Sequence, residues 1–250
     1  MTDMADLTGE MTSTDTATET AEEQAMAQDM TTSWDLDGRQ APARAPAPGS
    51  RSPGEQHIGA LVSALTVLDT RLLDDWGQKL AVTLRRGGRL LVAGNGGSAA
   101  QAQHLASEFS GRFVADRTAY SAIALSAESS TVTAIANDYG YDEVFARQVR
   151  AHGRPGDVLL AMSTSGRSRN LLRAAAAAQA GGIAAWCLTG PAPNPLADAC
   201  DEAVCVYPAG ARALSLTATV QEAHQVALHL ICLAFDAVTV PEQGAAGWNR

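Results

Sequence analysis

The chain has 250 residues, 46% of them hydrophobic, which is enough to bury the core of one sizeable domain. It carries 18 Lys and Arg against 27 Asp and Glu, a net charge of −9, so we expect no nucleic-acid partner. The start lacks the basic and apolar regions of a signal peptide, and no apolar run reaches the roughly 18 residues of a membrane helix. With four cysteines and no CxxC pair, these features predict a cytoplasmic protein that binds no membrane.

The first 55 residues differ in composition from the rest. Residues 1–56 contain 11 acidic residues and three arginines, and they include the Pro-rich segment APARAPAPGSRSPG. Such a segment repeats apolar residues at neither a helical nor a strand period. We therefore predict a disordered tail over residues 1–55, one domain over 56–240 and a flexible C-terminus over 241–250.

The predicted domain opens with two helices. Apolar residues recur every three or four positions from Ile58 to Leu72, and a second helical stretch covers Asp74 to Leu84. Short apolar runs then alternate with helical segments, and a long helix from about Leu214 to Phe235 closes the domain. The five runs are RLLVAGN, YSAIALS, DVLLAMS, IAAWCLTG and EAVCVYP. This alternation predicts an α/β fold with a doubly wound, five-stranded parallel sheet, in which ligands bind beyond the carboxyl ends of the strands.

Two loops at that edge have the composition of a phosphate site. The first, GNGGS over residues 94–98, joins a strand to a helix, where glycines allow close backbone approach and free N–H groups attract an anion. The second, STSGRS over residues 163–168, adds four hydroxyl side chains. Because Lys79 is the only lysine, neutral donors would do most of the binding. A plain tight turn in the first loop and helix-capping hydroxyls in the second remain the alternatives.

Polar side chains also mark two helices. His104 and Glu108 are four residues apart after the first loop, so they share a helix face. The closing helix carries Gln221, Glu222, His224 and His229 among apolar residues. A single helical histidine is more often structural, but two polar sets on two helices beside an anion site favour chemistry.

Several motifs, in order, carry a resemblance to a known family. They are GNGGSAAQAQHLASEFSGRF, ANDYGYDEVF, GDVLLAMSTSGRSRN, LTG and VQEAHQVALH. Over about residues 57–237 the chain resembles the phosphoheptose isomerases of the sugar isomerase (SIS) family. The resemblance implies isomerisation of sedoheptulose 7-phosphate, a phosphorylated seven-carbon sugar, to D-glycero-D-manno-heptose 7-phosphate through an enediol. It also implies a homotetramer with active sites between subunits.

The family's site residues map onto this sequence by their motifs. The resemblance implies Glu108 and His229 as the general acid/base pair, suited to moving protons between carbon and oxygen. It implies substrate contacts at Asn95, Gly96, Gly97, Ser98, Asp138, Ser163, Thr164, Ser165, Ser168 and Gln221. In members that bind Zn²⁺, with one ion expected per subunit, the ligands would be His104, Glu108, Gln221 and His229.

Spacing raises a question about that metal site. Gln221 and His229 are eight residues apart, about 12 Å along a helix. A zinc ligand lies about 2 Å from the ion. We therefore expect an ion bound where helices of different subunits meet, with a metal-free acid/base site inside one subunit as the alternative.

Two departures from the family pattern bear on sugar recognition. Thr219 stands where the family often has arginine, and Ala218 where some members have aspartate. The rival functions are a non-catalytic protein resembling the DnaA-associating replication factor and an isomerase of another phosphosugar. The non-catalytic relative lacks the catalytic carboxylate and terminal-helix histidine that Glu108 and His229 supply here.

Overall fold

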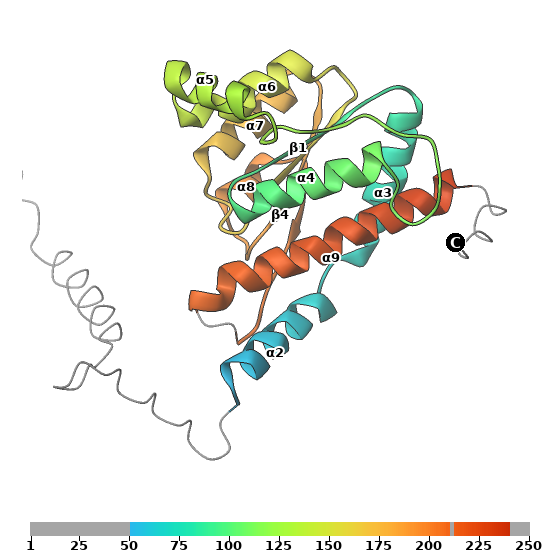
Figure 1. The fold of residues 1–250 in the computed structure, drawn as a ribbon. Helices are drawn as coiled ribbons and strands as arrows, with labels where there is room; N and C mark the ends of the chain where they lie inside the picture. Colours follow the sequence, from blue (N-terminus) through green and yellow to red (C-terminus); the bar gives the residue numbers. More distant parts are fainter. Residues whose placement is uncertain (1–50, 211–212, 241–250) are drawn as a thin grey trace, which may run out of the picture. The chain divides into compact units, whose positions relative to one another are not determined.

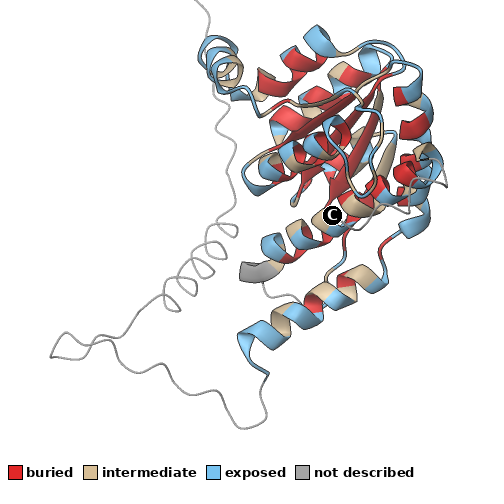
Figure 2. Ribbon diagram, turned by 45° about the vertical axis from the view of Figure 1, so that its right-hand side comes forward, coloured by how far each residue is buried: buried red, intermediate tan, exposed pale blue. Residues whose placement is uncertain are grey.

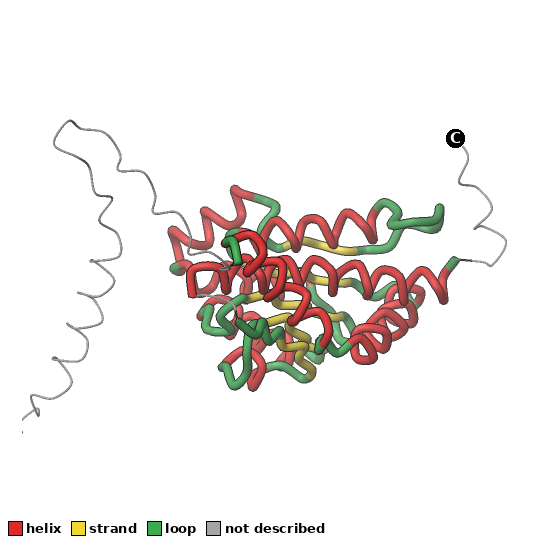
Figure 3. The backbone as a smooth tube through the Cα atoms, turned by 90° about the horizontal axis from the view of Figure 1, so that it is seen from below, coloured by secondary structure: helices red, strands yellow, loops and turns green. Residues whose placement is uncertain are grey.

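Five parallel strands form the sheet that the alternating pattern predicts. They are β1 (Leu90–Gly94), β2 (Ala122–Ala124), β3 (Val158–Ser163), β4 (Ala184–Thr189) and β5 (Glu202–Cys205). Their order is β2-β1-β3-β4-β5, and every neighbouring pair is parallel. The order reverses between β1 and β3, so the prediction of a doubly wound α/β sheet is confirmed. Figure 3 shows the strands enclosed by helices.

This computed structural model describes residues 51–210 and 213–240 (Figure 1). The predicted disordered tail, apart from residues 51–55, and the predicted flexible C-terminus over 241–250 lie outside the described residues. None of the described helices is long and apolar enough to span a membrane.

Helices cover both faces of the sheet. On one face lie α2 (Pro53–Thr66), α3 (Thr70–Arg85), α4 (Gly97–Ser110) and α9 (Ala213–Thr239). On the other lie α5 (Ser129–Tyr139), the short 3-10 helix η1 (Tyr141–Glu143), α6 (Val144–His152), α7 (Arg169–Ala180) and α8 (Pro195–Ala199). Because α4 and α9 lie on the same face and contact each other, their side chains can form the site described below (Figure 1).

The core is split in two by the sheet. Leu90, Val92 and Leu160 point into the half beneath α3, α4 and α9, whereas Leu91 and Leu159 point into the half beneath α6 and α7. Strands buried on both faces read as continuous apolar runs, which is why the sequence pattern found them. Figure 2 shows the central strands coloured as buried.

The first predicted helix, Ile58 to Leu72, is wrong in its bounds. Ser52 caps α2 in a capping box with Glu55, so the helix begins at Pro53, and it ends at Thr66. The Asp69 side chain accepts a hydrogen bond from Leu72 N at 3.0 Å and starts a new helix, α3. The apolar spacing continues across this break, which hid it from the periodicity.

Two helices were not anticipated from the sequence. The segment VFARQVRAH forms α6, and the Pro-rich loop after β4 contains α8, which Asn194 caps by accepting from Ala197 N. The closing helix was expected from about Leu214 to Phe235, and α9 extends it to Thr239.

Candidate active site

The two glycine- and hydroxyl-rich loops lie side by side. They follow β1 and β3, which pair in register as far as Gly94 and Met162, so both loops leave the same edge of the sheet. Gly96 has a φ of 54°, and a Cβ on Gly94 would lie 2.5 Å from the carbonyl oxygen of Ser98. Only glycine suits these two positions, and the first loop is a tight strand-to-helix turn with α4 starting at Gly97.

Hydroxyl groups in the second loop are held by the loop itself. Ser163 Oγ accepts a hydrogen bond from Gly166 N at 3.1 Å and lies 3.3 Å from Ser168 Oγ. Ser165 Oγ accepts from Arg167 N at 3.3 Å. Ser168 occupies the N-cap position of α7 but its side chain makes no capping bond, so helix capping does not account for that hydroxyl. Thr164 is half-buried.

An asparagine pair joins the first loop to the helix that follows the second. Asn95 Nδ2 donates to Asn170 Oδ1 at 3.0 Å, and Asn170 Nδ2 donates to Asn95 Oδ1 at 2.9 Å. Tyr141, from η1, also donates its hydroxyl to Asn95 Oδ1 at 3.0 Å. The sequence predicted Asn95 but neither partner, although Tyr141 lies in the motif ANDYGYDEVF and Asn170 ends the motif GDVLLAMSTSGRSRN, because only the packing of η1 and α7 beside the first loop brings them to Asn95.

The other predicted sugar contacts lie at different depths. Ser98 is buried at the first turn of α4. The Gln221 amide packs against Gly97, where an added Cβ would be 2.5 Å from Gln221 Nε2. Asp138 is exposed on α5 and accepts a hydrogen bond from Asn137 Nδ2 at 2.9 Å.

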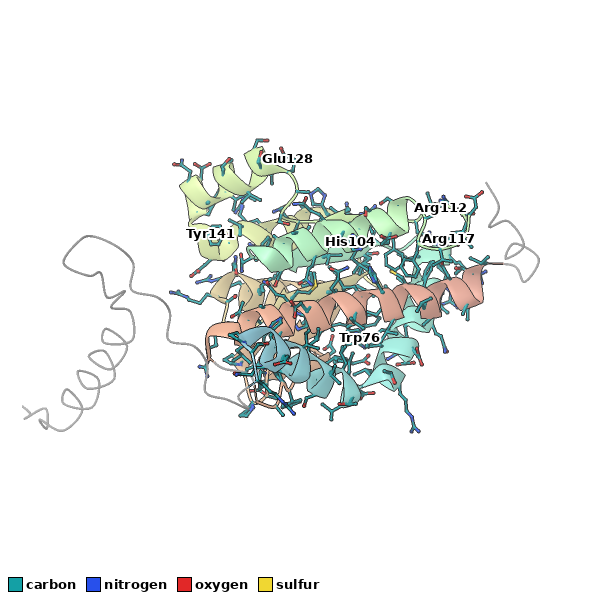
Figure 4. All side chains as sticks on the ribbon, turned by 60° about the horizontal axis from the view of Figure 1, so that its bottom comes forward. Trp76, His104, Arg112, Arg117, Glu128 and Tyr141 are labelled. Atoms are coloured by element: carbon teal, nitrogen blue, oxygen red, sulfur yellow. The ribbon has the colours of Figure 1, made fainter. Side chains whose placement is uncertain are left out.

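The proposed acid and base both lie beside His104, where α4 packs against α9. His104 Nε2 lies 3.0 Å from His229 Nε2 and 3.4 Å from Glu108 Oε1. The Glu108 side chain is 17% exposed and that of His104 is 41% exposed, so both can be reached from solvent. Figure 4 shows His104 on α4, facing α9. One chain therefore brings all three side chains together, the arrangement that the alternative of an acid/base site inside one subunit predicts.

Gln225 is a further polar residue on this line. It lies one turn from both Gln221 and His229 on α9, and its Nε2 is 3.1 Å from His229 Nε2. Gln101, on α4, donates to the backbone oxygen of Gln221 at 2.7 Å and approaches Gln225 Oε1 at 3.5 Å. The i, i+4 spacing of Gln221, Gln225 and His229 in the sequence is the signal that could have found Gln225.

The donor atoms at His104 fit a zinc ion in their chemistry. Two imidazole nitrogens and a carboxylate are ligands that zinc prefers. In residues 51–210 and 213–240, however, no three His, Cys, Asp or Glu side chains form a ready-made metal-binding group. Gln221, the fourth ligand that the resemblance implies, packs at the start of α4 against Gly97.

One of the two departures from the family pattern, Thr219, lies next to the N-terminal helix. Thr219 is fully buried, and its Oγ1 lies 3.3 Å from His57 Nδ1. The other ring nitrogen of His57 pairs with Glu222 at 2.8 Å. Thr219 thus contacts α2, and Ala218 adds no polar group beside it.

Comparisons with known proteins agree with this architecture. The family model of the SIS domain matches residues 55–190. A phosphoheptose isomerase of Streptomyces coelicolor is 62% identical over 172 residues, 69% of this chain and 71% of the relative, and one of Thiobacillus denitrificans is 50% identical over 165 residues, 65% and 81% respectively.

Solved structures agree as well. The structure of a phosphoheptose isomerase from Neisseria gonorrhoeae is 37% identical in sequence, with a TM-score of 0.63. The match covers 73% of this chain and 94% of the chain in that structure. One from Francisella tularensis matches 74% and 94%, with 31% identity and a TM-score of 0.65. This chain therefore belongs to the SIS-domain family and, within it, to the phosphoheptose isomerases.

Proposed function

We propose that this chain converts sedoheptulose 7-phosphate to D-glycero-D-manno-heptose 7-phosphate through an enediol. The observation that carries the proposal is the meeting of Glu108, His104 and His229 in one chain whose strand ends carry two hydroxyl-rich loops. A carboxylate and imidazoles supply acid/base groups, and the loops supply neutral phosphate donors. The relatives named phosphoheptose isomerase support the choice of a seven-carbon sugar.

The reaction needs two transfers of a proton at carbon. Glu108 removes a proton from C1 of the ketose while O2 gains one, which gives the enediol. Glu108 then returns the proton to C2 while O1 loses its own, which leaves the aldehyde at C1. The imidazole of His229 suits the oxygen transfers, because histidine both accepts and donates a proton near neutral pH. His104 stands between the two and orients them.

We also propose one Zn²⁺ per subunit, bound by His104, Glu108 and His229, with Gln221 as the fourth ligand supplied from a second subunit, because about 12 Å of helix separates it from His229 in one chain. The facing imidazole nitrogens and the carboxylate support it. When bound, the ion would polarise the carbonyl and stabilise the negative oxygen of the enediolate. The zinc content of the purified wild type, and turnover with and without a chelator, test this part separately.

Self-association, with a homotetramer as the expected form, completes the proposal. Ile58 and Val62 on α2 are 62% and 55% exposed, and Leu233 on α9 is 50% exposed. Large apolar side chains that gather on packed helices favour burial by a second copy. The free thiols of the four described cysteines are compatible with the predicted cytoplasmic localisation.

Turnover of sedoheptulose 7-phosphate, followed by NMR alongside pentose and hexose phosphates, tests the function. Glu108→Gln keeps the size and hydrogen bonding of the side chain but removes the base, so we expect kcat to fall by roughly a hundredfold or more. Glu202→Gln is the matched control. Glu202 is the first residue of β5, an outer strand of the sheet, and it contacts Trp76 and Lys79. A Glu108→Gln enzyme as fast as this control would refute the assignment, and preference for another sugar phosphate would change the substrate.

A further inference from the structure

The Asn95 amide is almost fully used by partners within the chain. Its Oδ1 accepts from both Asn170 Nδ2 and the Tyr141 hydroxyl, and its Nδ2 donates to Asn170 Oδ1. An amide nitrogen has two hydrogens. One Nδ2 hydrogen of Asn95 is therefore left for a ligand at the first loop.

The asparagine pair alone does not decide which group faces the ligand. If both amides turned over together, each would again donate to and accept from the other. Asn95 would then offer a ligand the free lone pair of its oxygen instead of an N–H group. In the structure the Tyr141 hydroxyl donates to Asn95 Oδ1, and in this orientation the nitrogen keeps its free hydrogen.

Ion pairs hold Tyr141 in place for this contact. Its neighbours in η1, Asp142 and Glu143, pair with Arg169 and Arg173 of α7, each at 2.8 Å. Because Asn170 also lies on α7, the same helix anchors both partners of Asn95. Figure 4 shows Tyr141 near the start of α4, with Arg112 and Arg117 beyond the other end.

We propose that Tyr141 is a positioning residue of the sugar phosphate site, which holds the Asn95 amide in the orientation where one N–H group points to an oxygen of the bound sugar phosphate. The inference rests on the proposed function in taking Asn95 as a ligand contact. Tyr141 itself acts through Asn95 and takes no part in proton transfer.

The test compares Tyr141→Phe with Tyr139→Phe. Both tyrosines are 55% exposed and lie two residues apart, but the Tyr139 ring packs under Arg147 and its hydroxyl makes no contact with the first loop. Loss of one hydrogen bond that orients a donor should raise the KM and the Kd for sedoheptulose 7-phosphate about two- to tenfold. The kcat should stay close to the wild-type value, and Tyr139→Phe should match wild type in all three.

A double-mutant cycle distinguishes positioning from a general structural effect. In an Asn95→Ala background, Tyr141→Phe should change kcat/KM no further, because the amide that it orients is gone. An unchanged KM in Tyr141→Phe, or the same fold-change with and without Asn95, would overturn the proposal.

Calorimetric binding of sedoheptulose 7-phosphate keeps this result separate from the proposed function. If wild type binds the sugar but does not isomerise it, the function fails while the Kd of Tyr141→Phe still tests the positioning role. If wild type does not bind it, both are wrong.

Discussion

His224 is a fully buried histidine on α9 that the proposed chemistry does not use. The backbone of Thr189 lies nearby, but neither ring nitrogen makes a hydrogen bond of normal geometry within the described residues. Burial disfavours the charged ring and lowers the pKa of His224 to about 4. The residue is therefore neutral in the folded protein at physiological pH.

This burial predicts a specific loss of stability in acid. Between about pH 6.5 and 4 the unfolded chain binds a proton at His224 that the folded chain does not, so the free energy of unfolding falls as the pH falls. The loss is on the order of 3 kcal/mol for a shift of this size. Urea unfolding at pH 7 and pH 4 should show a smaller pH dependence in His224→Leu than in wild type. His152→Leu, which alters an exposed histidine on α6, should retain the wild-type dependence.

The sequence predicted contacts between residues correctly where their spacing along one helix alone places them on the same face. His104 and Glu108 share a face of α4 as the four-residue interval requires. The contact between His104 and His229 joins residues 125 apart, so only the resemblance, and no local pattern, pointed to it. Tyr141 and Asn170 were missed for the same reason, because their role depends on how η1, α7 and the first loop pack together.

The helices α2 and α9 share a contact that leaves apolar side chains exposed. His57 pairs with Glu222 across the two helices, and Ala60 and Ala64 of α2 are buried. The opposite side of α2 exposes Ile58 and Val62. A helix that is apolar on two sides is expected to pack against two neighbours, of which this chain supplies one.

We therefore predict that Val62→Asp separates the proposed oligomer into smaller particles. A carboxylate placed in an apolar interface loses its hydration without gaining a partner, which costs more than the lost apolar contact. Light scattering coupled to gel filtration should show smaller particles with unchanged helical content by circular dichroism. Val82→Asp on α3, at a site that is 50% exposed, is the control and should keep the wild-type mass. A Val62→Asp variant of wild-type mass would show that this side of α2 does not form the interface.

At the level of elements, the sequence predicted strands better than helix ends. The central strands β1, β3 and β4 are apolar runs buried on both faces, a pattern that flanking glycines and polar residues delimit. The break between α2 and α3 depends instead on the cap that Asp69 provides, while the apolar spacing runs on past it. The short α8 is set by Asn194 and by packing of Leu196, which local periodicity does not encode.

Across the whole molecule, the first glycine- and hydroxyl-rich loop and Glu108 lie at opposite ends of α4. Ser98 and Glu108 lie ten residues apart on α4, which is about 15 Å of helix. His104, Glu108 and His229 nevertheless meet within one chain. This separation supports an active site in which the loops of one subunit face the acid/base group of another, while the acid/base group itself is not divided.

Mixing variants that are impaired in different parts of the site tests this division. Hybrids of Glu108→Gln with His229→Ala should stay inactive, because every acid/base group then lacks either Glu108 or His229. Hybrids of Glu108→Gln with the double variant Ser165→Ala, Ser168→Ala should regain turnover at low substrate concentration, since some sites combine an intact loop with an intact acid/base group. Native mass spectrometry of differently tagged chains verifies that hybrids form. Activity in the first mixture would place Glu108 and His229 on different chains, and none in the second would place the whole site in one subunit.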